Sequence, residues 1–371
     1  GANATFDGIT ADETIAICAR PLNNTLNFNF GQRAFSYTPP TGFKSLNSKN
    51  LPPITPSIVR PQKHFETLLY TGDGQNNRRV TGLEFKPDLV WLKARAQSGG
   101  GEISADHGWY DSIRGVTKRL KSNSEDAEGT VPIKSFDDVG FTFATEMYYN
   151  ANASSFVAWC WKAGGAAASN SDGSITSSVS ANTISGFSVV TWTGTNGNGT
   201  VGHGLGKAPK WIVIRRRDSG SSWVVYHYGV GNTKRLTLDS IGGESSASAN
   251  WFNNTSPTST TFSVGSDGGS NGSTDGYVAW CWADISGFSK FDKYIGNGSS
   301  DGVYVHLGFR PAWIMVKRTS STDSWLILDN KRDTYNPATQ TQAPQSNLQD
   351  NLNTGGIPTD FLSNGFKCRG S

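Results

Sequence analysis

One six-residue pattern occurs twice in this chain, and its spacing sets the size of the folding units. Residues Phe156–Trp161 read FVAWCW, and Tyr277–Trp282 read YVAWCW, 121 residues further along. A second pair, GVTKRL at Gly115–Leu120 and GNTKRL at Gly231–Leu236, recurs in the same order at a shift of 116 residues. Self-similarity at a near-constant spacing indicates tandem structural repeats.

A third mark extends the pattern to the end of the chain. A proline followed by an apolar run and a cation occurs three times, as KPDLVWLK (86–93), APKWIVIR (208–215) and RPAWIMVK (310–317). We therefore predict three related repeats, named the first (61–165), second (186–285) and third (286–371) repeat. The third has no counterpart of FVAWCW, and we expect either that the natural chain continues past Ser371 or that another chain adds the missing strand.

The segments inside each repeat are typical of short β-strands. Apolar runs rich in β-branched and aromatic residues, such as Trp223–Tyr228 and Trp325–Leu328, alternate with Gly, Asn, Ser and Asp clusters that favour tight turns. Charged residues make up only 17% of the chain, and 43 glycines and 15 prolines exclude coiled coils and long helical bundles. The predicted fold class is all-β, with tandem β-sandwich or jelly-roll-like modules and little helix.

Two stretches are expected to lie outside these modules. Residues 1–60 contain a short alternating segment and then TPP and LPPITP, which favour an extended course. They are interpreted as the end of an upstream lectin-like β module plus a Pro-rich linker. Residues 166–185 begin with AAASNSDGS and are predicted to be a flexible Gly/Ala/Ser linker between the first two repeats.

Charge and residue spacing argue against several classes of function. The net charge of +3 is too small to indicate a nucleic-acid partner, and the absence of a long apolar run argues against membrane insertion. The four cysteines and five histidines show no metal-ligand spacing, so no metal site and no cofactor are expected. The cysteines are predicted to be buried, reduced thiols.

Several stretches resemble proteins of marine bacteriophages. Asn29–Asn47 is similar to the end of the SPRY or concanavalin-like module of phage virion proteins, and PDLVWLK and FVAWCWKAGG are similar to a repeated domain of unknown function that often follows it. The resemblance implies a virion structural protein, located extracellularly in a tail or surface appendage. It implies other virion proteins and a host cell-surface glycan or protein as partners, and it carries no catalytic residue to this chain.

Aromatic residues are the candidate contacts for such a partner. Tryptophans that recur between repeats are predicted to be core; these are Trp91 with Trp211 and Trp313, Trp159 with Trp280, Trp161 with Trp282, and Trp223 with Trp325. Aromatic residues unique to one repeat are better placed to contact a ligand from loops. The candidate carbohydrate or receptor contacts are Trp109, Tyr110, Tyr148, Tyr149, Trp251 and Tyr335.

The leading hypothesis is a non-enzymatic tail fibre or tail appendage, a homotrimer, that takes part in host attachment. One alternative is an architectural capsid or tail decoration protein without a ligand. Another is a glycan depolymerase, which would need two carboxylates at a cleft; the available ones are Asp106, Asp111, Asp137, Asp138, Asp239, Asp329 and Asp333. A calcium loop at Asp267, Asn271 and Asp275 is weighed against a plain Gly-rich turn, which is preferred.

Overall fold

The computed structural model describes Ala34, Thr38, Ile58 and residues 60–96, 106–131, 133–144, 148–246, 249–350 and 357–370. The chain divides into two compact parts, residues 1–53 and 54–371. The predicted lectin-like module and linker at 1–60, and Cys18, lie almost wholly outside the described residues. Everything below concerns the second part.

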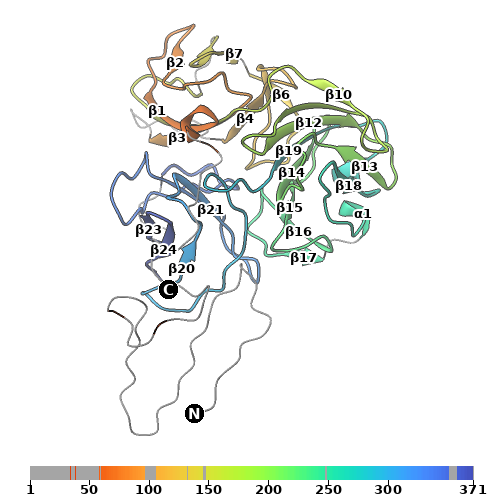
Figure 1. Cartoon of the computed structure of the whole chain (residues 1–371). Helices are drawn as coiled ribbons and strands as arrows, with labels where there is room; N and C mark the ends of the chain where they lie inside the picture. The colour runs from red at the N-terminus through yellow and green to blue at the C-terminus, as the bar shows by residue number, and fades with distance from the viewer. Residues whose placement is uncertain are drawn as a thin grey trace, which may run out of the picture. The chain divides into compact units, whose positions relative to one another are not determined.

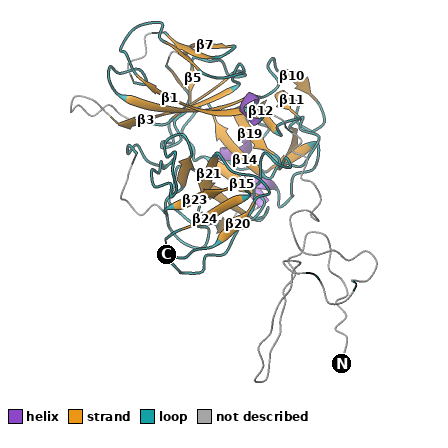
Figure 2. Ribbon diagram, turned by 60° about the vertical axis from the view of Figure 1, so that its left-hand side comes forward, coloured by secondary structure: helices purple, strands orange, loops and turns teal. Residues whose placement is uncertain are grey.

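The described residues are almost entirely β-structure, as predicted, in several antiparallel sheets (Figures 1 and 2). The first repeat contains a 3-10 turn, η1 (Pro61–Lys63), and nine strands. These are β1 (Phe65–Thr71), β2 (Arg79–Thr81), β3 (Leu89–Ala96), β4 (Gly108–Asp111), β5 (Lys118–Arg119), β6 (Gly129–Thr130), β7 (Ile133–Asp137), β8 (Gly140–Phe143) and β9 (Ser155–Trp161).

The second repeat and the stretch before it contain ten strands and two short helices. The strands are β10 (Ala168–Asn170), β11 (Ser177–Asn182), β12 (Phe187–Thr193), β13 (Gly199–Gly202), β14 (Trp211–Arg216), β15 (Val224–His227), β16 (Lys234–Thr237), β17 (Ser245–Ser246), β18 (Thr261–Val264) and β19 (Gly276–Trp282). The helices are α1 (Ala249–Phe252) and α2 (Gly268–Asn271). The third repeat contains β20 (Tyr304–His306), β21 (Trp313–Val316), β22 (Leu326–Asp329), β23 (Thr359–Leu362) and β24 (Gly365–Cys368).

Each repeat has a larger sheet and a smaller one. In the first repeat the order β1-β9-β3-β4 faces the sheet β2-β8-β7, and in the second the sheet β10-β11-β12-β19-β14-β15-β16-β17 is accompanied by the pair β13-β18. The third repeat has β21-β22 and β20-β24-β23. Separate buried apolar clusters lie in the three repeats, as expected for β-sandwich modules.

In the first and second repeats, the central strands of the larger sheet are buried on both faces. Along β3, Val90 and Leu92 belong to the core of the first repeat, whereas Leu89 and Trp91 belong to a second cluster that draws residues from all three repeats. We call this second cluster the shared core. It contains the recurrent tryptophans Trp159, Trp161, Trp211, Trp223, Trp280, Trp282 and Trp325, each buried. The core assignment is confirmed for these seven tryptophans and for Trp91, whereas Trp313 is partly buried and packs against the shared core. Residues 54–371 form one compact unit.

One alignment of tryptophans was wrong by two residues. Trp91 lies opposite Trp159 in the β3-β9 pair, whereas Trp211 lies opposite Trp282 in the β14-β19 pair. Leu89 is the residue opposite Trp161 and thus the counterpart of Trp211. Both positions point to the shared core because residues two apart in a strand lie on the same face.

The stretch 166–185 is not a linker. It contains β10 and β11, and β11 pairs with β12 at the edge of the large second sheet. Small residues are compatible with a strand there, because an edge strand needs backbone pairing more than large side chains. The other domain boundaries stay a prediction.

Equivalent hydrogen bonds connect each repeat to the next in a closed cycle. Glu128, Glu244 and Asp350 are spaced 116 and 106 residues apart, and the backbone N–H of each donates to a carbonyl of the neighbouring repeat. The three bonds are Glu128 to Arg217 O (2.8 Å), Glu244 to Thr319 O (2.7 Å) and Asp350 to Arg95 O (3.0 Å). Three ring nitrogens lie within hydrogen-bond distance of loop carbonyls in the same cyclic order: His107 to Ala343 (3.1 Å), Trp223 to Lys121 (2.9 Å) and Trp325 to Thr237 (3.0 Å). The first repeat therefore contacts both others directly.

Three cations complete the cycle: two lie within β3 and β14, and the third directly follows β21. Each donates to a loop carbonyl of the neighbouring repeat: Lys93 to Asn347 (3.0 Å), Arg215 to Glu125 (2.6 Å) and Lys317 to Ile241 (3.2 Å). Lys93 and Arg215 are fully buried. Burial lowers the pKa of Lys93 to about 7 and the pKa of Arg215 to about 10.

Candidate binding hollow between the first and second repeats

A hollow of about 430 Å³ lies where the first repeat meets the second. Its lining comes from three segments: the loop after β5, the residue Ser222 before β15, and the end of β16 with the loop that follows it. The lining residues are Asn123, Ser124, Glu125, Ser222, Thr237, Asp239 and Ser240. All carry hydroxyl, amide or carboxylate groups, so the hollow is polar.

The position of Asp239 is fixed by the backbone. Its Oδ1 accepts a hydrogen bond from the Trp223 N–H (2.9 Å), just as Asn123 Oδ1 accepts from the His107 N–H (2.8 Å) in the first repeat. Burial raises the pKa of Asp239, and the nearby charge of Glu125 raises it further, while Arg215 acts in the opposite direction. Asp239 is therefore a carboxyl that gains a proton more readily than a surface aspartate does.

Glu125 lies on the other side of the seam. Its Oε1 accepts a hydrogen bond from Ser222 Oγ (2.6 Å), and its carbonyl accepts from the buried Arg215 Nη2 (2.6 Å). Its carbonyl also accepts from the Ser221 N–H (3.0 Å). The loop that carries Glu125 is thus held to the second repeat by backbone and side chain together.

This arrangement suits a polyhydroxylated ligand. Carboxylate oxygens accept hydrogen bonds, and serine, threonine and asparagine side chains both donate and accept. The hydroxyl groups of a sugar have the same two capacities. The lining set includes no aromatic side chain for a sugar ring to stack on.

The six aromatic residues predicted from the sequence lie elsewhere. Trp109, Tyr110 and Tyr149 are 0%, 0% and 1% exposed, so their assignment as surface contacts was wrong. Trp109 belongs to the shared core, with its ring 5.1 Å from Trp223 and 4.7 Å from Trp280, because its strand β4 is covered on both faces. Tyr110 packs beside Tyr149 in the core of the first repeat.

The other three aromatic residues are accessible but separate. Tyr148 is 49% exposed with the Arg119 guanidinium 5.8 Å from its ring, and Tyr335 is 86% exposed. Trp251 is half-buried, and the Arg235 guanidinium lies 4.0 Å from its ring. None of the three belongs to the lining of the hollow, and their role as contacts stays a prediction.

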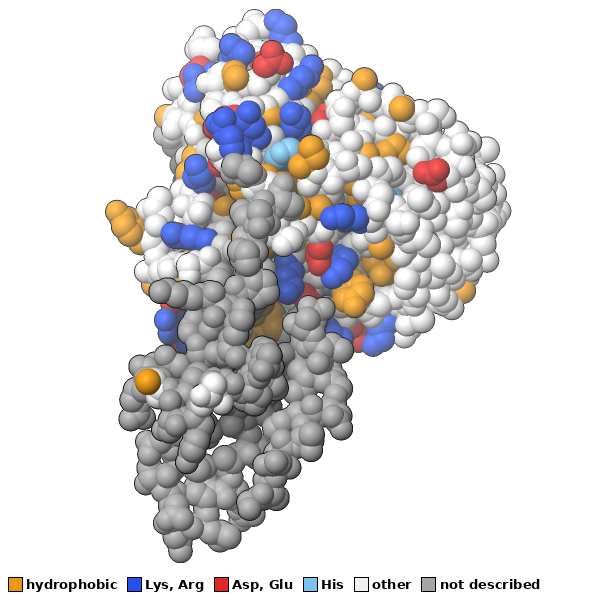
Figure 3. All heavy atoms as spheres, viewed as in Figure 1, with side chains coloured by type: hydrophobic (Ala, Val, Ile, Leu, Met, Phe, Trp, Pro, Cys, Tyr) orange, Lys and Arg blue, Asp and Glu red, His pale blue; other side chains and the backbone are white. Residues whose placement is uncertain are grey.

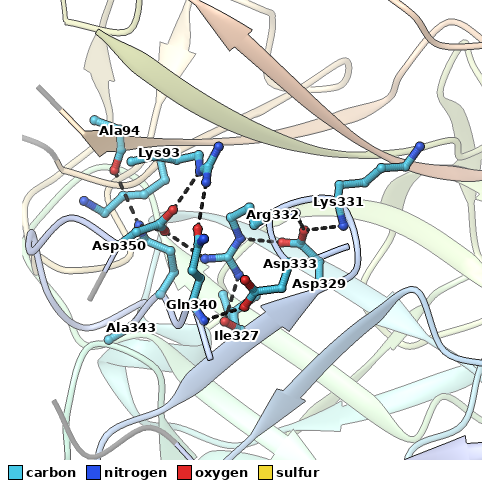
Figure 4. A network of polar contacts seen from close by, with 12 residues as sticks. Lys93, Ala94, Ile327, Asp329, Lys331, Arg332, Asp333, Gln340, Ala343 and Asp350 are labelled. Carbon is cyan, nitrogen blue, oxygen red and sulfur yellow. Dashed lines mark hydrogen bonds and ion pairs between the residues drawn. The ribbon is translucent and has the colours of Figure 1, made fainter. Parts of the chain in front are cut away.

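The seam between the first and third repeats contains a network of charged side chains. Figure 4 shows the fully buried Arg332 between Asp329 and Asp350, with Nε–Oδ2 and Nη1–Oδ1 distances of 2.6 Å and 2.9 Å. Asp350 also binds Arg95 (2.7 Å) and Gln342 (2.6 Å). Because every carboxylate here already has several partners, this network is structural.

The residues weighed as a calcium loop are also engaged within the protein. Asp267 caps α2 by accepting from the Gly269 N–H (2.7 Å), Asn271 donates to Gly197 O (2.6 Å), and Asp275 pairs with Arg216 (2.7 Å). Among the described residues, no group of three or more His, Cys, Asp or Glu side chains is arranged to hold a metal ion. No helix of the described part is long and apolar enough to cross a membrane. Cys160, Cys281 and Cys368 are free and buried.

Sequence reasoning missed most of the hollow. Asp239 was among the available carboxylates, but Glu125, Ser222 and Thr237 were not considered. The only signal for them is indirect: they follow the repeated TKRL segment or precede the repeated tryptophan, where the seams form.

Comparison with known proteins gives one match. No curated protein and no solved structure matches the chain. A family model described as "Domain of unknown function (DUF7483)" matches residues 60–371, which include the hollow and all three repeats. The chain therefore belongs to the DUF7483 family.

Proposed function

We propose that this protein is a non-catalytic structural component of a phage virion, in a tail fibre or tail appendage, that binds a host surface glycan through the hollow. The observation that carries the binding part is the polar lining at the seam, where Glu125 is held by hydrogen bonds from the second repeat and Asp239 by the Trp223 N–H of its own repeat. The phage setting, the extracellular location and the homotrimer rest on the resemblance of residues 29–47 and of the repeated motifs.

The surface around the second repeat supports a glycan ligand. On the face in Figure 3, the region over β10–β18 consists mostly of backbone and uncharged side chains, whereas Lys and Arg side chains gather over the first repeat. Neutral sugars are recognised by hydrogen-bonding groups rather than by net charge. The hydroxyl, amide and carboxylate groups that line the hollow fit such recognition.

The test is retention on cells. Labelled protein is mixed with candidate marine host bacteria and washed, and the bound fraction is compared with that of Asp239→Asn. Asn123 already makes the equivalent hydrogen bond in the first repeat, so Asn at 239 preserves the fold while removing the charge. We expect about tenfold weaker retention, since a hydrogen bond to a charged group contributes about 1.5–3 kcal/mol.

Asp138→Asn is the matched control, because Asp138 is exposed and distant from the lining. It should bind like the unchanged protein. Absence of retention on every host of a phage that carries the protein would contradict attachment and favour the architectural alternative.

A second candidate function is glycan hydrolysis. Its basis is the pair Glu125 and Asp239, two carboxyl groups on one hollow, of which Asp239 has a raised pKa as a general acid requires. The same cell experiment separates the two functions. Sugar fragments in the supernatant that disappear with both Glu125→Gln and Asp239→Asn would establish hydrolysis, and retention without released sugar would establish binding alone.

A further inference from the structure

Within the described part of the chain, the third repeat's counterpart of the central strands β3 and β14 is β21, and it pairs on one side only. β3 pairs with β9 and β4, and β14 pairs with β19 and β15, whereas among the described residues β21 pairs with β22 alone. Equivalent residues are opposite the outer strand in all three sheets: Leu89 faces Asp111, Trp211 faces His227 and Trp313 faces Asp329. The open side of β21 therefore corresponds to the place of β9 and β19.

The register of the absent strand follows from the other two sheets. The last tryptophan of β9 lies opposite Leu89, and the last tryptophan of β19 lies opposite Trp211. The earlier tryptophan of each strand lies opposite the residue two positions later in the partner strand: Trp159 opposite Trp91, and Trp280 opposite Val213. A strand with the same pattern on β21 would thus place its two tryptophans opposite Trp313 and Met315.

The surroundings of β21 are suited to such a strand. Trp313, Met315, Phe291 and Val230 are partly buried hydrophobic residues that pack against the shared core. In the first and third repeats, the Arg114 and Arg332 guanidinium groups lie 5.4 Å from the rings of Trp280 and Trp159. Val230, 116 residues after Arg114, holds the equivalent position for a third tryptophan.

The other neighbour of the absent strand is also irregular. β1 and β12 flank β9 and β19 on their far sides, but the matching residues 290–297 form no strand. Ile295 there is 88% exposed. Neither β21 nor residues 290–297 therefore pair with a strand at the position that β9 and β19 occupy in the other two sheets.

We propose that the open side of β21 is a binding site for an antiparallel strand with the pattern aromatic-Val-Ala-Trp-Cys-Trp, supplied from outside these 371 residues. Both copies of the pattern inside them, β9 and β19, already pair on two sides. Side chains alternate between the two faces of a strand, so this pattern fits the two surfaces beside β21. The tryptophans would face the shared core, and the small Ala and Cys would face the third repeat's own cluster of Ile314, Leu328 and Phe366. Main-chain pairing supplies affinity and the alternate side chains supply specificity.

The experiment uses the whole 371-residue chain and a labelled peptide with the sequence of Gly276–Trp282, Cys replaced by Ala and lysines added at both ends for solubility. We expect saturable binding by fluorescence anisotropy. Hydrogen exchange should slow at Trp313–Val316 and at 290–297 and stay unchanged at β3 and β14. A control peptide with both tryptophans replaced by serine should bind at least tenfold more weakly.

A second arm guards against weak binding in solution. The same peptide, fused after Ser371 through a flexible Gly/Ser linker, gains a high effective concentration at the site. The fusion should raise the melting temperature, and the serine fusion should not. The proposal would be overturned if the two peptides had equal effects, if exchange slowed elsewhere in the chain, or if neither arm showed an effect. It would also be overturned if the chain formed a dimer in which β21 is protected, because a second copy would then occupy this edge.

Discussion

The first and third repeats hold their seams with the same buried arginine network, and the second repeat does not. Arg114 binds Asp111 (2.6 Å) and Glu128 (2.9 Å), and Arg332 binds Asp329 (2.6 Å) and Asp350 (2.9 Å). At the places of Asp111 and Arg114, the second repeat has His227 and Val230. Equivalent positions are thus compatible with either a charged network or an apolar contact.

The difference matters for energy. Both arginines are fully buried with their aspartates. Each guanidinium is stabilised by two carboxylates and by one backbone carbonyl, that of Trp109 or of Ile327. Removing one member leaves an uncompensated buried charge, which costs more than the intact pair contributes. The second repeat has no such dependence.

The largest expected effect comes from breaking the network. Arg332→Ala and Arg114→Ala should each lower the free energy of unfolding by about 3–5 kcal/mol, measured by urea denaturation. Arg79→Ala is the control, since Arg79 is 56% exposed and pairs with Asp137 at 3.5 Å; its loss should cost less than about 1 kcal/mol. Similar losses for the buried and exposed arginines would remove the distinction.

A double variant sharpens the comparison further. Arg114→Val alone leaves Asp111 charged and buried, whereas Asp111→His with Arg114→Val reproduces the residues of the second repeat. The double variant should therefore be more stable than Arg114→Val. Strict additivity of the two changes would contradict the coupling between them.

The next effect depends on pH and compares two seams. Lys93 is fully buried with a pKa of about 7, below its value of about 10.4 in an unfolded chain. Between these values the unfolded chain binds a proton that the folded one lacks, so the folded protein should gain about 2 kcal/mol of stability from pH 7 to pH 9. Below pH 7 the cost of burying the charge is fully present.

Lys93→Met should remove most of that pH-dependent gain in denaturant titrations at the two pH values. Lys317→Met is the matched control at the seam between the third and second repeats. Burial also lowers the pKa of Lys317, but its side chain is only partly buried. The dependence of the free energy of unfolding on pH should therefore change less in Lys317→Met than in Lys93→Met. If the free energy of unfolding of Lys93→Met rises between pH 7 and pH 9 as much as that of the unchanged protein, Lys93 keeps its proton in the folded state.

The sequence predicts the fold class well because its signals are local. Alternating strands, glycine-rich turns and the twice-repeated VAWCW segment each depend on neighbours in the chain, and the sheets form where these signals occur. The two-residue error at Trp91 arose because Leu89, not a tryptophan, faces Trp161 in the first repeat. A pattern of residue types cannot distinguish positions that point to the same face.

The seams and the hollow could not be predicted in this way. Lys93 and Arg215 follow apolar runs in the sequence like ordinary solvated cations, yet the loop of another repeat covers them. Trp109 looked like a loop residue unique to the first repeat, but its strand β4 is buried between two cores. Each of these outcomes depends on which surfaces meet across about a hundred residues.

A smaller effect separates two tryptophans at equivalent positions. Trp159 Nε1 donates to Asp329 Oδ2 (3.0 Å), whereas Trp280 Nε1 is buried with no hydrogen-bond partner among the described residues. Changing either to Phe removes similar volume, but only Trp159→Phe removes a hydrogen bond to a charged group. Its free energy of unfolding should fall by about 1.5 kcal/mol more than that of Trp280→Phe; equal losses in urea would contradict the pairing.

The smallest effect concerns the two arginines that follow Lys118 and Lys234 in the repeated TKRL segment. The Arg235 guanidinium lies 4.0 Å from the ring of Trp251, and the Arg119 guanidinium lies 5.8 Å from the ring of Tyr148. Tryptophan is the stronger partner for a cation and the distance is shorter, so Arg235→Ala should cost about 0.5–1 kcal/mol and Arg119→Ala less. Replacing each arginine by lysine keeps the charge and should restore part of the loss at 235 only. If Arg119→Ala costs more in the same denaturation assay, the contact between Arg119 and Tyr148 contributes more to stability than its geometry implies.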